Sequence, residues 1–302
     1  MNQSATYNIS SIEWYAQMAC VIQVPITFSG FVSNILLIIA HSKDPLKTLK
    51  VSSSLFIINI AFIDVILSFV YLIWSLLTIV SSEYRPILKE GITATVIDTF
   101  MEMCYPSFMC LSIERFCSIA FPLWHRVRLT TRVCRYWICT TWLFHLIFET
   151  LLRTLLDIQE KLIFKLVYQL VCFLCAQVFY LGTYISLKKQ RKNILADENI
   201  SETTSRMIRK RLENEKRFLV TIAIVCGILV VTLLPQMINV LVFGLIFPTI
   251  GKNLTRNRTN GIIFMVISLS LFSINLAVNP FVYLWRLPRY RKTFKNLYCF
   301  PG

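Results

Sequence analysis

Residues 52–80 read SSSLFIINIAFIDVILSFVYLIWSLLTIV, a stretch in which Asp64 is the only charged side chain. A bilayer core about 30 Å thick needs roughly 20 mostly apolar residues for one helix to cross it, so this stretch is long enough. The whole chain has the same character, because 56% of its 302 residues are apolar, 16% are charged and the mean hydropathy is +0.61. Soluble domains carry about 25% charged residues. The sequence therefore predicts a membrane-embedded protein.

Six further apolar stretches of similar length lie on either side of this one. Charged clusters separate them, and neither an internal repeat nor a Gly/Ser linker divides the chain, so we expect one membrane domain over residues 18–287. An extracellular segment, 1–17, precedes it, and an amphipathic helix with a short cytoplasmic tail, 288–302, follows it. The predicted fold is an all-α bundle of seven transmembrane helices, at residues 18–41, 52–80, 91–121, 135–152, 162–187, 218–247 and 261–285.

The basic residues are distributed unevenly over the predicted loops. With the amino terminus outside, the outer segments hold 8 of the 31 Lys and Arg residues and the inner segments hold 23. Because Lys and Arg are retained on the cytoplasmic side, we expect a multi-pass protein of the plasma membrane with its amino terminus outside. The net charge of +15 favours membrane lipids as partners over nucleic acid in so apolar a chain. We expect the third inner loop, 188–217, to be a flexible linker.

Glycosylation sequons agree with this orientation in part. Asn8, Asn253 and Asn257 begin sequons in predicted outer segments, whereas the sequon at Asn199 falls in an inner loop. Asn8 is the expected glycan site, Asn253 and Asn257 are further candidates, and Asn199 should carry no glycan.

Charged residues inside the apolar stretches carry functional information. A charge at the bilayer centre costs about 2.5–3.5 kcal/mol, so Asp64, Glu114 and Arg115 each need a partner. Glu114 and Glu215 are the two candidate partners of Arg115. A pair between Arg115 and Glu215 would latch the third helix to the sixth. The alternative is that Glu215 only solvates the foot of the sixth helix.

Six short motifs occur in order along the predicted helices. They are Ser33-Asn34, Ala61-Phe62-Ile63-Asp64, Glu114-Arg115-Phe116 followed by Ile119-Ala120-Phe121-Pro122-Leu123, Trp142, Pro235 and Asn279-Pro280-Phe281-Val282-Tyr283. Over residues 18–299 this order resembles the rhodopsin-like (class A) G-protein-coupled receptors. The resemblance implies a receptor, not an enzyme, that transmits the signal of an extracellular ligand to a heterotrimeric G protein.

The resemblance also assigns roles to residues near the inner face. Pro235 and Pro280 remove backbone hydrogen bonds, so helices can bend there, and with Asn279 they form the expected activation hinge. The residues expected to serve G-protein coupling and the latch are Glu114, Arg115, Glu215 and Tyr283.

The chain departs from the family pattern at several positions. The usual cysteine at the outer end of the third helix is missing, and Glu90 stands near that point. Ala176 replaces a usual proline in the fifth helix, and Leu233 replaces a usual tryptophan before Pro235. Four features resemble melanocortin-type receptors. They are the absence of this cysteine, the absence of the proline in the fifth helix, a short second outer loop and the tail at 291–295. The acidic residues that hold the peptide ligands of those receptors are not matched.

Two further sets of polar residues could bind ligands. Asp64, Asn275 and Asn279 match positions that hold Na⁺ in many such receptors, and Na⁺ is the only cofactor we consider. Cys104 and Leu276 replace hydroxyl residues there, so we expect either a weakened sodium site or a cluster of hydrogen-bonded water.

Asp98 and Glu102 share one face of the third helix, at i and i+4. Two carboxylates at this depth favour a cationic ligand, either a basic peptide or a larger cation. A small biogenic amine is less favoured, because Asp98 is one residue out of register with the aspartate of the amine receptors that the chain resembles. The alternative is that one or both carboxylates pair with a neighbouring helix.

The tail carries an amphipathic pattern. Tyr290, Phe294, Leu297 and Tyr298 recur at helical spacing, with basic residues between them, which predicts a helix on the inner leaflet. Cys299 at its end is a palmitoylation candidate, with a free surface thiol as the alternative.

Other classes of protein fit less well. His41, His125 and His145 have neither metal-ligand spacing nor a catalytic partner set, which argues against a hydrolase or a metal site. A transporter would more often show internal repeats. An opsin would carry a lysine in the seventh helix, and 261–285 contains none.

Overall fold

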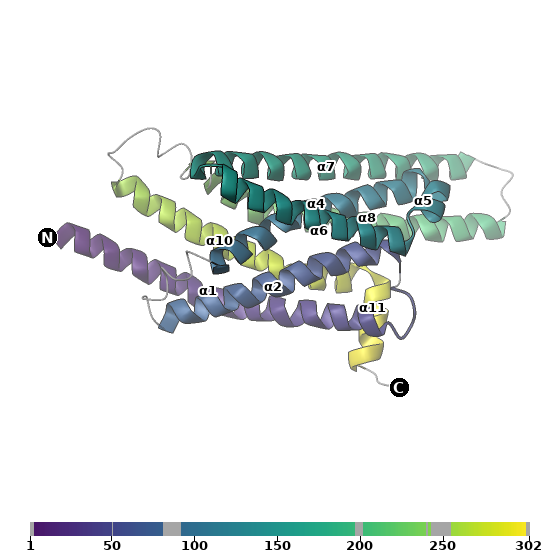
Figure 1. The fold of residues 1–302 in the computed structure, drawn as a ribbon. Coiled ribbons are helices and arrows are strands. Elements are labelled where there is room, and N and C mark those ends of the chain that lie inside the picture. Colours follow the sequence, from purple (N-terminus) through teal and green to yellow (C-terminus); the bar gives the residue numbers. More distant parts are fainter. Residues whose placement is uncertain are drawn as a thin grey trace.

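The computed structural model describes residues 3–49, 51–80, 92–196, 202–239, 241–242 and 255–299. Within these residues seven long helices run side by side as one elongated bundle (Figure 1). They are α1 (Gln3–Lys43), α2 (Ser52–Val80), α4 (Ile92–Ala120), α6 (Thr131–Leu155), α7 (Ile158–Ala196), α8 (Glu202–Asn239) and α10 (Thr255–Arg286). Each contains most or all of one predicted span, so the all-α, seven-helix prediction is confirmed.

Several helices extend beyond their apolar stretches. α1 begins at Gln3, inside the segment 1–17. Of the segment 188–217, residues 188–196 belong to α7 and residues 202–217 to α8, so the prediction of a flexible linker there is wrong. The reason is that Lys, Arg, Gln, Glu and Leu are good helix formers, and extending an existing helix needs no new nucleus.

Two short helices lie at the end of the bundle opposite the amino terminus (Figure 1). α5 (Pro122–Arg128) follows α4, and α11 (Pro288–Phe294) leads into the helical turn η2 (Lys295–Cys299). Proline begins α5 and α11, where its missing N–H costs no helical hydrogen bond. α11 crosses the bundle end with Tyr290 buried and Arg291 exposed, as the amphipathic pattern predicts.

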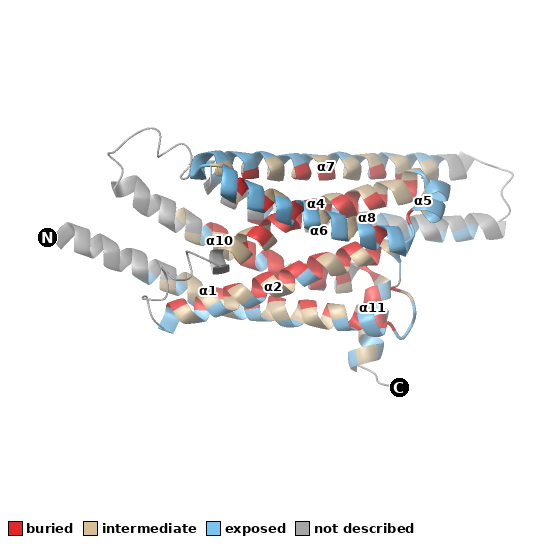
Figure 2. Cartoon of the chain, in the orientation of Figure 1, coloured by how far each residue is buried: buried red, intermediate tan, exposed pale blue. Residues whose placement is uncertain are grey.

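The surface of the bundle is apolar. Figure 2 shows buried residues gathered between the helices and exposed ones along the outward faces of α6 and α7. Soluble monomers rarely expose apolar patches above a few hundred Å², so lipid is the natural solvent for this surface. The exposed residues of α7 include Ile163, Phe164, Val167, Leu170, Val171, Leu174, Val178 and Leu181.

In the described residues, four helices are long and apolar enough to cross a membrane, judged by length and composition. They are Gln17–Lys43, Ser52–Val80, Ile158–Gln190 and Val266–Trp285. α4 is not among them because its charged residues, including Asp98, Glu102 and Glu114, lower its hydropathy. Glu102 and Glu114 are buried inside the bundle.

The helices α1, α2 and α10 approach one another closely at Gly30. A Cβ atom on Gly30 would lie 2.9 Å from Ser68 Oγ and 3.3 Å from the backbone nitrogen of Ala277. One turn later, Asn34 Nδ2 donates a hydrogen bond of 2.9 Å to the backbone oxygen of Leu276. The missing side chain of Gly30 therefore sets the distance between α1 and its neighbours.

Candidate functional site

At the inner end of α4, Glu114 and Arg115 form a buried ion pair. Arg115 Nε lies 2.5 Å from Glu114 Oε2, and Arg115 Nη2 lies 2.6 Å from Glu114 Oε1. His125 of α5 places Nε2 2.9 Å from the same Oε1. Of the two candidate partners of Arg115, the structure brings Glu114 into contact. The side chain of Glu215 is outside the described residues.

A cavity of about 380 Å³ opens beside Arg115, between the inner ends of α2, α4 and α8 and the start of α11. Among the described residues that line it, five are cations and none is a carboxylate. Such a lining attracts an acidic or carboxylate-bearing partner. The five cations are Arg115, Lys210, Arg217, Arg289 and Lys292.

The predicted hinge and coupling residues lie on the helices that surround this cavity. Pro280 is buried within α10, and Pro235 lies within α8. Tyr283 is buried one turn below Pro280, and its ring centroid lies 6.3 Å from that of Tyr290 in α11. Bending of α10 at Pro280 would therefore move Tyr283 and the wall of the cavity that Tyr290 lines.

At the opposite end, charged residues of α4, α6 and α7 converge around Lys165 of α7. Lys165 Nζ lies 2.6 Å from Glu102 Oε1 and 2.9 Å from Glu149 Oε1. All three residues are buried, with 6%, 3% and 3% of the surface of Lys165, Glu102 and Glu149 exposed. An ammonium thus sits between carboxylates of two other helices.

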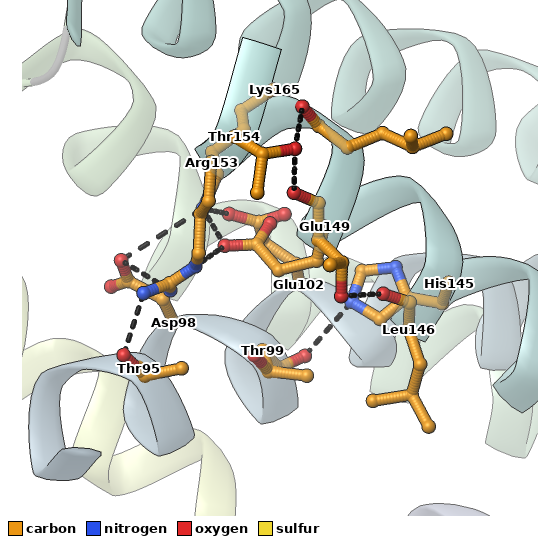
Figure 3. A network of polar contacts seen from close by, with 12 residues as sticks. Thr95, Asp98, Thr99, Glu102, His145, Leu146, Glu149, Arg153, Thr154 and Lys165 are labelled. Atoms are coloured by element: carbon orange, nitrogen blue, oxygen red, sulfur yellow. Dashed lines mark hydrogen bonds and ion pairs between the residues drawn. The ribbon is translucent and has the colours of Figure 1, made fainter. Parts of the chain in front are cut away.

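Arg153 and Asp98 complete this group of charges (Figure 3). Arg153 Nε lies 2.6 Å from Glu149 Oε1, and its Nη1 donates to Thr95 Oγ1 at 2.6 Å. Asp98 Oδ2 lies 3.7 Å from Arg153 Nη2 and 3.8 Å from Lys165 Nζ. The Asp98 side chain is 47% exposed, so this end of the group reaches the surface of the bundle. We call Asp98, Glu102, Glu149, Arg153 and Lys165 the outer ion cluster.

The cluster confirms the second interpretation of the Asp98–Glu102 face, pairing with neighbouring helices, and a cationic ligand at this face stays a prediction. Both carboxylates pair with cations of neighbouring helices, Arg153 of α6 and Lys165 of α7. Three members, Glu149, Arg153 and Lys165, were not among the residues predicted from the sequence. The signals were present: Lys165 lies within the apolar stretch 162–187, and Glu149 and Arg153 stand at i and i+4.

A family model described as "7 transmembrane receptor (rhodopsin family)" matches residues 33–283. The chain belongs to this family. It is therefore a multi-pass membrane receptor that transmits the signal of an extracellular ligand to a heterotrimeric G protein, and the family consists of receptors rather than enzymes.

The fold of the receptor is similar to that of a solved invertebrate relative. The crystal structure of squid rhodopsin matches it with a TM-score of 0.77 and 15% sequence identity, covering 95% of this chain and 86% of the squid chain. No curated protein sequence matches the chain.

The centre of the receptor holds the polar residues that were compared with a sodium site. Asn279 Nδ2 donates to Asp64 Oδ2 at 2.9 Å, and Asn275 is buried in the same helix as Asn279. Asp64 Oδ1, Asn279 Oδ1 and both amide atoms of Asn275 have no hydrogen-bond partner in the described part of the chain. Buried oxygens of this kind fit a hard cation. The amide nitrogen of Asn275 is a donor, which a water molecule would satisfy and Na⁺ would not.

Several predicted modification sites fall outside what the structure describes. Asn253 and Asn199 are outside the described residues. Asn8, Asn257 and Cys299 lie in α1, α10 and η2, but their side chains are outside the described set. Glycosylation and palmitoylation therefore stay predictions.

Proposed function

We propose that the receptor lies in the plasma membrane with its amino terminus outside and responds to a cationic ligand, a basic peptide or a larger organic cation. One observation carries this proposal: in the outer ion cluster three carboxylates face two cations. Because an uncompensated charge inside a bundle is costly, a ligand that brings one positive charge stabilises the cluster.

Asp98 is the member best placed to meet such a ligand. Its side chain is exposed, and its ion-pair distances of 3.7 and 3.8 Å exceed hydrogen-bond length. A cation bound to Asp98 would change the balance of contacts that Arg153 and Lys165 make with Glu102 and Glu149. A ligand shifts a receptor only by binding its two states unequally, and this rearrangement across three helices supplies such a difference.

At the inner end, we propose that Glu114 holds Arg115 in the resting state, with Glu215 as a second partner from α8. Once released, Arg115 contacts the G protein in the cavity beside it. The two-point contact between Glu114 and Arg115 and the cationic lining of the cavity support this role. We propose that α10 bends at Pro280, which moves Asn279 and Tyr283, and that α8 bends at Pro235. This bending would connect the outer ion cluster to the pair of Glu114 and Arg115.

The polar centre is the proposed site of Na⁺ or of a water cluster. Asp64 would supply the charge, and Asn275 and Asn279 would supply amide oxygens. The unpartnered donor of Asn275 and the buried Cys104 and Leu276, which offer no hard oxygen, favour water as at least part of the content.

Further proposals concern the periphery. Glycans on Asn8, with Asn253 and Asn257 as candidates, a palmitoyl chain on Cys299 and lipid contacts along α11 would fit the orientation. A relationship to melanocortin-type receptors is supported by the very short connection between α6, which ends at Leu155, and α7, which begins at Ile158.

The test is a screen of second-messenger responses in cells that express the receptor, with basic peptides and organic cations against neutral and anionic compounds. For any cationic agonist found, Asp98→Asn and Glu102→Gln should lower potency about tenfold or more, since a hydrogen bond to a charged group contributes about 1.5–3 kcal/mol. Glu160→Gln is the matched control, because Glu160 is exposed on α7 outside the cluster. Unchanged potency in both cluster variants, at normal surface expression, would exclude the cluster as the ligand site.

A further inference from the structure

The outer ion cluster encloses an ammonium group that the receptor supplies itself. Lys165 Nζ lies 2.6, 2.9 and 3.8 Å from the carboxylates of Glu102, Glu149 and Asp98. These three acids come from two helices, and their oxygens surround one nitrogen that carries three N–H donors. The donor set and its buried position are those of a site that binds a primary ammonium.

The site has acceptor capacity that Lys165 does not use. Glu102 Oε2 and Glu149 Oε2 are buried and have no hydrogen-bond partner among the described residues. Lys165 contacts the other oxygen of each glutamate. Since a buried carboxylate oxygen without a donor is costly, these two atoms mark places where donors of a further or different cation would be stabilised.

We propose that the outer ion cluster is an ammonium-binding site that Lys165 occupies as an internal ligand, and that the external ligand of the receptor carries a primary alkylammonium group that takes its place. The inference rests on the proposed function, because it names the chemical group and the binding atoms at that same cluster. Lysine suits an internal occupant, since its ammonium is a compact charge on a flexible stem that can withdraw.

Displacement of Lys165 would act on the helix arrangement directly. Lys165 is the member that joins α7 to α4 through Glu102, and Arg153 holds Glu149 within α6. A free ligand that satisfies Glu102 and Glu149 would leave α7 without its closest ionic contact with α4. The exposed Asp98 side chain provides the outer edge at which a ligand ammonium arrives.

The test is chemical rescue of Lys165→Ala, measured as the thermal midpoint of the purified receptor in lipid nanodiscs. This change removes three methylene groups and the ammonium, which together correspond to n-propylammonium. We expect the variant to melt below the wild type and n-propylammonium to raise its midpoint in a dose-dependent manner, as for any ligand that binds the folded state. n-Propanol and an equal concentration of NaCl should not do so, and the wild type should respond little because Lys165 fills its site.

Two further variants test whether the effect of n-propylammonium depends on the cluster. Adding Glu102→Gln to Lys165→Ala removes the charged partner nearest the ammonium and should raise the concentration needed for half of the effect about 10- to 100-fold. Lys161→Ala removes a lysine one turn earlier on α7 that makes none of the cluster's ion pairs, and it should give no response to n-propylammonium. If Lys165→Ala is recovered folded only from cells grown with n-propylammonium, that recovery also supports the site.

The proposal is overturned if n-propylammonium fails to stabilise or recover Lys165→Ala, or if it shifts wild type, Lys161→Ala and Lys165→Ala equally. These measurements need neither an agonist nor a G protein. Rescue together with a screen in which only neutral or anionic agonists are active would leave the ammonium site standing and remove the proposed cationic ligand. Failed rescue, together with a cationic agonist that depends on Asp98, would overturn the ammonium site and leave the proposed cationic ligand standing.

Discussion

At the scale of single residues, Glu114 does more than pair with its neighbour. Its carboxylate meets the guanidinium of Arg115 through both oxygens and His125 of α5 through one of them. Charge-assisted contacts with two donors in a planar fork are among the stronger polar contacts in proteins. Glu114 therefore fixes both the motif arginine and the short helix that begins at Pro122.

Gly30 contributes to stability because its missing side chain lets α1 approach α2 and α10 closely. Gly30→Ala should destabilise the receptor by about 1–3 kcal/mol, because the new methyl group would meet Ser68 Oγ at 2.9 Å and α10 backbone at 3.3 Å. The measurement is the thermal midpoint of the purified protein. Gly227→Ala in α8 is the control, since a Cβ there meets nothing within 4 Å. The control should be neutral or stabilising by about 0.5–1 kcal/mol. A Gly30→Ala protein as stable as wild type would contradict the close approach of α1.

At the scale of elements, the tail helix offers a test of membrane attachment. Cys299 ends η2, beyond the basic residues of α11. If it carries a palmitoyl chain, acyl-exchange labelling after hydroxylamine should mark the wild type and lose most of its signal in Cys299→Ser. A single acyl chain gives only marginal anchoring, so the amphipathic helix should stay membrane-bound in the variant through its other contacts. Equal labelling of both proteins would show that Cys299 is a free thiol.

The elements also show what could be predicted from the sequence and what could not. The seven spans could be predicted because length and hydropathy are local properties of the chain. The helical extension of α7 and α8 into 188–217 could not, because a polar segment rich in helix formers is indistinguishable from a linker until a neighbouring helix nucleates it.

Some contacts of the candidate site could also be predicted from the sequence, and others could not. The pair of Glu114 with Arg115 joins adjacent residues, so it was among the predicted alternatives. The contacts of Lys165 with Glu102 and Glu149 join three helices, and nothing in the local sequence of 162–187 indicates which carboxylates lie opposite it. Asp98 and Glu102 were correctly placed on one helix face, but their partners depend on how α6 and α7 pack against α4.

At the scale of the whole molecule, orientation is the first property to test. If the amino terminus is outside, Asn8→Gln should remove a mobility shift that N-glycan removal produces in the wild type. Asn199→Gln should leave that shift unchanged, because its sequon lies on the proposed inner side. A shift that depends on Asn199 and not on Asn8 would mean that the 8-to-23 division of basic residues had been assigned to the wrong sides.

The bundle places an ion cluster with an excess of carboxylates at one end and a cationic cavity at the other. α4 contributes Asp98 and Glu102 to the first and Arg115 to the second, so one helix connects the two. α7 and α8 pack on each other as well, which gives a second route from the cluster to the cavity wall. We propose that the pair of Glu114 and Arg115 restrains signalling until ligand binding at the cluster changes the helix packing along this path.

This restraint is measured most directly as ligand-free nucleotide exchange on a panel of purified heterotrimeric G proteins, catalysed by the receptor in lipid vesicles. Glu114→Gln should raise exchange by about 5- to 150-fold with at least one G protein, the range expected for a coupling free energy of about 1–3 kcal/mol. Arg115→Ala added to it should return exchange to the level without receptor, and Arg132→Ala, a charge removed from the exposed start of α6, should change nothing. Exchange that is no higher in Glu114→Gln than in the wild type, or that survives the loss of Arg115, would show that this pair does not restrain signalling.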